Sequence, residues 1–265
     1  MKQLFILVLS FLTITISAQS YRNVDNNAFD TGEKLTYDIA FSSLLTGNMT
    51  AGKLTLEVMP NKKTVANRST FYVVAQGNST GFFELFYKVN DRFESYIDEK
   101  AILPLKFIQR KRENSYRKND TMYFNQLENT AKSTQKEFDI PANAHDMVSA
   151  LYYARTLEFD KMVKGSLINI PFVIDDSVYH SRIIYVGRQI VKTKMGEFNC
   201  FAFKPMVATG KVFDQKYPMT FWVTDDSNHL PVLIESKLSV GKARIEITSY
   251  EGILKPIRNL ALNRK

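Results

Sequence analysis

Along most of this chain, apolar and polar residues alternate in short segments that Gly, Asn and Asp separate. A period of two is typical of strands that bury one face. A flat open sheet of about a dozen strands is unusual, so we expect the sheet to curl or to pack as two layers. The prediction is a mainly β fold, a curved antiparallel sheet or incomplete barrel. The expected strands span 33–41, 48–59, 68–77, 86–98, 103–117, 121–126, 132–138, 167–174, 180–192, 197–206, 220–224, 231–239 and 243–251.

The alternation is interrupted once, between residues 141 and 160, where apolar residues recur at helical spacing. This pattern predicts one amphipathic helix near mid-chain. Asn143 is the expected N-cap, with Asp146 three residues later reaching back to it. The apolar stripe of the helix consists of Met147, Ala150, Leu151, Ala154 and Leu157.

The N-terminus has the layout of a cleavable export signal. Lys2 precedes an uncharged run at 4–16, and the small residues Ser17 and Ala18 follow it. The alternative is a membrane anchor, which needs about 20 apolar residues. Because serine and threonine interrupt this shorter run, we expect cleavage near Ala18 and a mature protein that is periplasmic or secreted.

The rest of the chain has no long linker and no low-complexity tract. After a signal peptide at 1–18 we expect a flexible lead at 19–28, one β-rich domain at 29–254 and a basic tail at 255–265. The alternative is a division into two domains at Pro141. No cysteine stands directly after the signal region, which argues against a lipid-anchored lipoprotein.

The chain is basic, with a formal net charge of +8. For an exported protein this favours anionic lipid head groups and acidic glycans over nucleic acid as partners, and it is compatible with peripheral membrane contact. The single cysteine, Cys200, lies in an aromatic-rich strand pattern. We therefore expect a buried thiol and not a nucleophile.

The usual catalytic motifs do not occur. The three histidines, His145, His180 and His229, are far apart, and no zinc-type spacing, nucleophile elbow, phosphate loop or dinucleotide fingerprint accompanies them. We predict no metal site, no cofactor and no catalytic residue.

Paired carboxylates are the remaining catalytic candidates, since glycoside hydrolysis needs only two. Strand alternation places Asp91 and Glu94 on opposite faces. Asp175 and Asp176 are better explained by a hairpin turn. An enzyme that acts on envelope polysaccharide through Glu94 and Glu113 is kept as an alternative.

A basic stripe and two aromatic residues are the candidate ligand-binding groups. Alternation sets Arg110 and Arg112 on the same side of one strand, where they can meet an anion. A solvated strand face or a strand edge protected by charge is the favoured explanation of the stripe. The aromatic stretch 82–87 can border a groove, but core packing is the expectation. The candidate ligand-binding residues are Arg92, Arg110, Arg112, Tyr116 and Trp222.

Several segments carry a family resemblance, namely 32–37, 51–52, 87–95, 97–98, 103–104, 146–155, 221–232 and Gly241. Together they resemble an exported bacterial family known as domain of unknown function 3108. The resemblance implies a curved, strand-rich exported domain, and it transfers no activity or catalytic residue. The layout is also similar to the incomplete barrels of periplasmic lipoprotein carriers, in which a helix covers an apolar cavity.

These observations favour a non-enzymatic binding or carrier protein of the cell envelope. Its ligand is expected to be lipid-like or glycan-like and to lie in a cavity of the curved sheet, with Arg110 and Arg112 meeting an anionic group. Besides the hydrolase, the alternative is an assembly factor that binds other envelope proteins along an exposed strand edge.

Overall fold

The computed structural model describes residues 20–43, 47–206, 216–239 and 241–257. The expected signal peptide and most of the expected basic tail lie outside the described residues.

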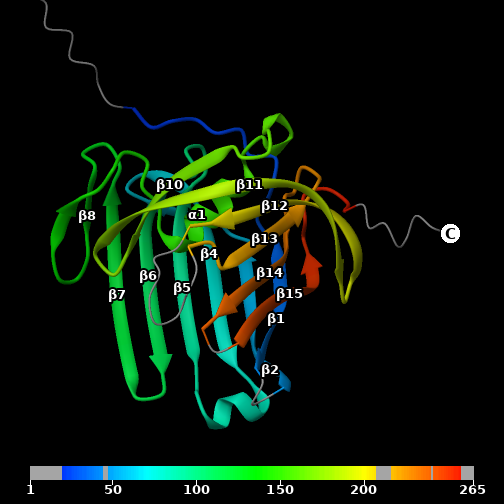
Figure 1. Ribbon diagram of the computed structural model, residues 1–265. Coiled ribbons are helices and arrows are strands. Elements are labelled where there is room, and N and C mark those ends of the chain that lie inside the picture. Colours follow the sequence, from blue (N-terminus) through cyan, green and yellow to red (C-terminus); the bar gives the residue numbers. More distant parts are fainter. Residues whose placement is uncertain (1–19, 44–46, 207–215, 240, 258–265) are drawn as a thin grey trace, which may run out of the picture.

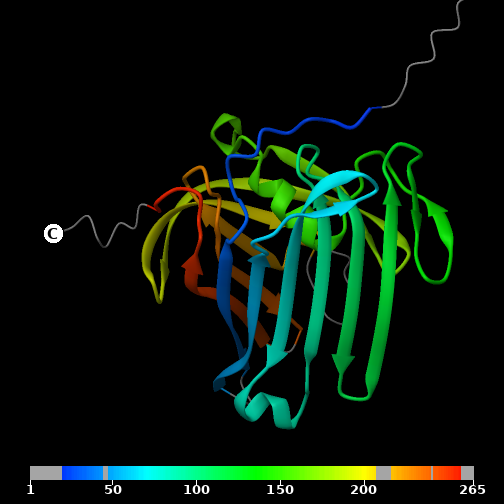
Figure 2. The same ribbon diagram turned by 180° about the vertical axis from the view of Figure 1, so that it is seen from behind.

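In the described part of the chain, fifteen strands form one antiparallel sheet (Figure 1). Its order is β10-β11-β12-β13-β14-β15-β1-β2-β4-β5-β6-β7-β8-β9, with β3 paired to β4. The sheet curls into an incomplete barrel, seen from both sides in Figures 1 and 2, which confirms the expected fold class. The strands are β1 Lys34–Ser43, β2 Gly47–Val58, β3 Lys63–Val65, β4 Arg68–Ser79, β5 Asn90–Asp98, β6 Pro104–Glu113, β7 Tyr116–Asn125, β8 Thr130–Lys132, β9 Glu137–Asp139, β10 Leu167–Ile174, β11 Ser177–Thr193, β12 Gly196–Pro205, β13 Met219–Thr224, β14 Pro231–Leu238 and β15 Gly241–Glu251.

One α-helix, α1 Met147–Arg155, lies against the inner face of the sheet (Figure 1). Its N-cap is Asp146, and the prediction of Asn143 was wrong. The Asp146 carboxylate accepts hydrogen bonds from the backbone N–H groups of Val148 and Ser149, and the Ser149 hydroxyl completes a capping box. Asn143 has φ +59°, whereas an N-cap residue adopts an extended backbone.

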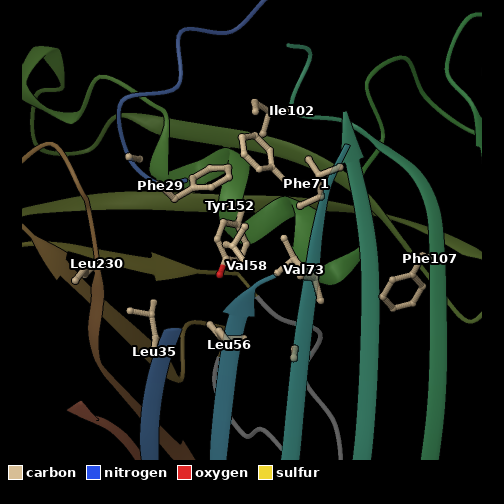
Figure 3. Close-up of a cluster of buried hydrophobic side chains, with 14 of the residues drawn as sticks. Phe29, Leu35, Leu56, Val58, Phe71, Val73, Ile102, Phe107, Tyr152 and Leu230 are labelled. Atoms are coloured by element: carbon tan, nitrogen blue, oxygen red, sulfur yellow. The ribbon is translucent and has the colours of Figure 1, made fainter. Parts of the chain in front are cut away.

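The core fills the space between α1 and the inner face of the sheet (Figure 3). The Tyr152 ring from α1 meets Phe29 edge to face at 4.7 Å between centroids, and Phe29 contacts Phe71 of β4 at 5.2 Å. Val58 and Val73 lie below them on neighbouring strands and are fully buried. The apolar positions of the alternating strands therefore bury the helix face that carries Tyr152.

Two segments differ from the structure that the sequence predicts for them. The strand expected at 103–117 divides into β6 and β7, because Asn114 turns the chain with φ +47°, a conformation that asparagine tolerates. The aromatic stretch 82–87 does not pack in the core. Much of it forms a short 3₁₀ helix, η1 Gly81–Leu85, with no buried residue, so the expectation of core packing was wrong. A second 3₁₀ helix, η2 Phe159–Lys161, follows α1.

The segment that was expected as a flexible lead makes specific contacts from residue 21 onward, where the Arg68 guanidinium lies 3.9 Å from the centre of the Tyr21 ring. The Arg22 side chain donates to the carbonyl oxygens of Ala101 and Ile102 at 2.9 and 3.2 Å. Its guanidinium also lies 4.0 Å from the centre of the Tyr153 ring. These contacts place the N-terminal segment across the end of the barrel that holds α1.

Candidate functional site

A cavity of about 440 Å³ lies between α1 and the inner face of β10 to β13. Among the residues that line it, only Ser181 and Arg155 have polar side chains. Several lining residues, including Leu151 and Ile183, are only half-buried, so solvent reaches the cavity. The apolar walls include Leu151, Ala154, Ile170, Ile183, Phe203 and Phe221.

The helix α1 separates this cavity from the core. Four residues of the predicted apolar stripe, from Met147 to Ala154, face the cavity, whereas Val148 and Tyr152 on the other side are buried. Helical periodicity places residues three and four apart on one face, so both sides of α1 carry apolar groups. The apolar stripe predicted from the sequence therefore forms mainly a wall of the cavity, and the opposite side of α1 packs in the core.

A buried ion pair fastens the C-terminal end of α1. Arg155 donates two hydrogen bonds of 2.6 Å to the Glu33 carboxylate, and both side chains are almost completely buried. The guanidinium also donates to the carbonyl oxygens of Ala28 and Asn228, so four of its N–H···O contacts are made. Burial alone would lower the pKa of Arg155, but the Glu33 charge outweighs it, and the pKa is raised.

The N-terminal end of α1 is fastened by a buried carboxyl group. The Ser95 hydroxyl of β5 donates to the Asp146 carboxylate at 2.6 Å, in addition to the two capping N–H groups. Burial raises the pKa of Asp146 to about 6, and the hydrogen bonds oppose that rise. His145, next to it, is buried, and its pKa lies well below the ordinary value.

A comparison with protein-family models identifies the family of this chain. A family model described as "Protein of unknown function (DUF3108)" matches residues 36–248. The chain belongs to the DUF3108 family. The comparison with curated proteins finds no match.

A solved structure shares the fold of this DUF3108 protein. A β-barrel-like protein of the DUF1849 family from Brucella abortus aligns with a TM-score of 0.55 at 9% identity, over 85% of this chain and 99% of that chain. A Bacteroides fragilis protein with a YmcC-like fold, which is predicted to be exported, aligns with a TM-score of 0.37 at 12% identity, over 87% of this chain and 100% of that chain. The Brucella structure supports the barrel-like architecture and no activity.

Segments of the sequence that resemble the DUF3108 family meet around α1. Glu33 comes from segment 32–37, Asn228 from 221–232 and Ser95 from 87–95. Each of them is hydrogen-bonded to a residue of segment 146–155, Ser95 to Asp146 and the other two to Arg155. His229 adds a fourth link, since its Nδ1 donates to the Arg155 carbonyl oxygen at 2.7 Å. The distinctive polar residues of these segments therefore fix the helix that forms the cavity wall.

The predicted ligand-binding arginines lie on the outer face of the sheet. Arg92 and Arg110 both bind the Glu94 carboxylate, with Tyr72 donating to its other oxygen at 2.7 Å. Burial would raise the pKa of Glu94, but these hydrogen bonds outweigh it and the pKa is lowered. Arg112 shares this face and is exposed. None of the three arginines lines the cavity.

The two predicted aromatic residues lie in different parts of the sheet. Tyr116 lies in the β6–β7 hairpin with Arg112, whereas Trp222 is separate from the arginines. Tyr116 is exposed at the start of β7. Trp222 lies on β13 between the cavity residues Phe221 and Val223, so its ring points to the opposite face, where Nε1 donates to Gln189 at 2.7 Å. The five predicted residues do not form one site.

The acids of the alternative hydrolase do not converge either. Glu94 pairs across β5 and β6 with Ile108, whereas Glu113 shares the parity of Gln109 and Phe107, so the two carboxylates lie on opposite faces. Asp175 and Asp176 form the β10–β11 turn with positive φ, as expected. Among the residues that the structure describes, no group of His, Cys, Asp or Glu could hold a metal ion.

Sequence reasoning did not find most of the cavity. Its walls on β10 come from alternate residues, Ile168 to Ile174, which carry the same alternating signal as any core-facing strand. The helical stripe was the one part visible in advance. Whether an apolar face meets a neighbour or an empty space depends on the spacing of elements, which local patterns do not encode.

Proposed function

We propose that this DUF3108 protein is a non-enzymatic carrier that holds an apolar, lipid-like molecule in the cavity beside α1. The observation that carries the proposal is the cavity itself. Its volume of about 440 Å³ falls within the range of about 300–1,000 Å³ that is typical of small-molecule sites, and its walls are almost entirely apolar.

The chemistry of the walls favours a lipid-like ligand over a glycan. A sugar carries several hydroxyl groups that need hydrogen-bond partners when they leave water. The cavity offers the Ser181 hydroxyl, while the guanidinium of Arg155 is already bound to Glu33. An acyl chain needs no such partners, and each buried methylene contributes about 0.8 kcal/mol.

Export to the envelope is part of the proposal. It is supported by the signal-like layout of residues 1–18. In the described ranges, no helix is long and apolar enough to cross a bilayer.

The first experiment is native mass spectrometry of the mature protein purified from its own envelope, followed by extraction and identification of small molecules. A copurifying lipid supports the proposal. A protein that arrives empty and also fails to bind the apolar fluorophore N-phenyl-1-naphthylamine would contradict it.

A matched pair of variants locates the binding. Ala154→Phe places a ring into the cavity, whereas Ala142→Phe adds the same ring at an exposed position before α1. Displacing about two methylenes of ligand weakens binding about tenfold. We expect this loss for Ala154→Phe and not for Ala142→Phe. Equal affinities of the two folded variants would exclude the cavity as the site.

A further inference from the structure

The connection between β4 and β5 lies at the end of the barrel away from α1 (Figures 1 and 2). It exposes a cluster of large apolar side chains. Phe82, Leu85 and Phe86 are 63%, 78% and 68% exposed, and Tyr87 follows them at 41%. Single exposed apolar residues are common, but a contiguous group marks an interaction surface. We call these four residues the apolar tip.

The apolar tip is held by a defined backbone. The N–H groups of Phe86 and Tyr87 both donate to the Phe83 carbonyl oxygen at 3.0 Å, and the Phe82 and Phe86 rings pack edge to face at 4.9 Å. Lys88 exchanges hydrogen bonds with Asn114 of the β6–β7 turn, 2.8 Å in each direction. The apolar side chains are therefore presented to solvent by a hydrogen-bonded scaffold.

The neighbouring β6–β7 turn places positive charge beside the apolar tip. Residues 81–92 and 110–118 together carry seven Lys or Arg and three Asp or Glu. Glu94 and Asp175 bind four of these cations, but the exposed side chains of Arg112 and Arg117 form no ion pair with the described residues. Tyr116, in the same turn, is 52% exposed.

We propose that the apolar tip docks this protein onto the surface of an anionic phospholipid bilayer. Phe82, Leu85 and Phe86 enter the boundary between head groups and acyl chains. Tyr116 lies at head-group level, and Arg112 and Arg117 meet lipid phosphates. Aromatic rings beside basic residues are typical of proteins that bind the interface of anionic membranes.

The shape of the tip favours a bilayer over a protein partner. A stable protein interface buries about 1,200–2,000 Å² in total, which needs a broad surface. The apolar tip is one short turn that projects from the end of the barrel (Figure 2), and a fluid bilayer can surround such a projection on all sides. The proposal does not depend on which ligand the cavity holds.

Vesicle sedimentation with the mature protein tests the apolar part of the proposal. We expect binding to vesicles of phosphatidylglycerol and phosphatidylcholine, and at least about tenfold weaker binding of the triple variant Phe82→Ser/Leu85→Ser/Phe86→Ser. The matched control is Val163→Ser/Ile190→Ser, which removes apolar side chains that are 74% and 66% exposed elsewhere. The control variant is expected to bind like the wild type.

A second comparison tests the charge. Arg112→Gln/Arg117→Gln is expected to lose about fivefold in affinity for anionic vesicles per residue. The reason is that each basic residue near an anionic surface contributes about 1 kcal/mol to binding, which corresponds to about fivefold. Lys164→Gln/Arg182→Gln removes two exposed cations from segments that do not adjoin the apolar tip and is expected to bind normally.

Three results would overturn the proposal. One is undiminished vesicle binding by the triple serine variant, and another is equal binding to anionic vesicles and to pure phosphatidylcholine. The third is no vesicle binding together with a concentration-dependent dimer that the triple variant abolishes, which would assign the tip to a second copy of the chain. Circular dichroism confirms that each variant is folded.

Discussion

Arg155, the last residue of α1, forms a two-pronged ion pair with Glu33, which lies 122 positions earlier in the chain and directly precedes β1. Both side chains are excluded from water. Because β1 joins the two halves of the sheet through its pairing with β15, the ion pair ties the helix to the seam of the barrel. The helix that borders the cavity is thus fixed at this end.

Removing one partner of this ion pair is expected to lower the free energy of unfolding. Arg155→Met leaves the Glu33 carboxylate buried without a counter-charge, and we expect a loss of about 3–5 kcal/mol in the free energy of unfolding, measured by urea denaturation at neutral pH. The control is Lys34→Met, which breaks a partly exposed contact of 3.7 Å with Glu57 and is expected to cost less than about 1 kcal/mol. Similar costs for the two variants would contradict the assigned role.

Asp146 predicts a specific pH dependence of stability. Its pKa is raised by burial from 3.8 to about 6, so the folded protein binds more protons than the unfolded chain between these values. The wild type should therefore lose stability relative to Asp146→Asn as the pH rises from about 4 to about 6, by on the order of 3 kcal/mol. His145 titrates in both proteins and its effect cancels. Urea denaturation across this range that gives parallel stability curves would refute the prediction.

The close approach of β2 and β4 explains a glycine in the second strand. A Cβ atom on Gly52 would overlap the carbonyl oxygen of Asn78 and lie 3.3 Å from the Ser79 Cα, and both are backbone atoms that cannot turn aside. Gly52→Ala is expected to cost about 1–3 kcal/mol of unfolding free energy in thermal or urea denaturation.

The control for this substitution lies on the facing strand. Gly77 has open space around its Cβ direction, so Gly77→Ala is expected to change stability by less than about 0.5 kcal/mol. If both variants lost stability equally, the loss would reflect glycine replacement in general and not the close approach at Gly52.

The thiol of Cys200 is expected to be inert in the native protein. Burial raises its pKa to about 12, so almost no thiolate forms at neutral pH, and reagents that attack thiolates need the chain to open first. Labelling with an aromatic disulfide reagent should be slow in buffer and rapid in denaturing urea. Rapid labelling of the folded protein would show that the strand around Cys200 is accessible.

Much of the fold was predictable because strand and turn signals are local. The strand expected at 167–174 matches β10 at both ends, and the turn expected at Asp175 and Asp176 has the positive φ that such residues tolerate. Predictions that depended on where a segment lies in the folded protein were less successful. The aromatic stretch 82–87 has the composition of a core segment, yet η1 exposes it, because it falls in a connection at the end of the barrel.

The candidate site was less predictable than the fold. Arg110 and Arg112 share a strand face, as alternation requires, but alternation does not say whether that face is inner or outer. The structure places Arg110 on Glu94, away from α1. The prediction that these arginines meet a ligand stays untested.

The sequence by itself determined the periodic elements of this protein, since alternation and helical spacing depend on residues a few positions apart. Only the tertiary structure decided which residues from distant segments meet. The pairing of Glu33 with Arg155 and the empty space beside Ala154 both arise from the curvature of the whole sheet. Curvature is set by the sum of many strand contacts, so no single segment of the chain contains it.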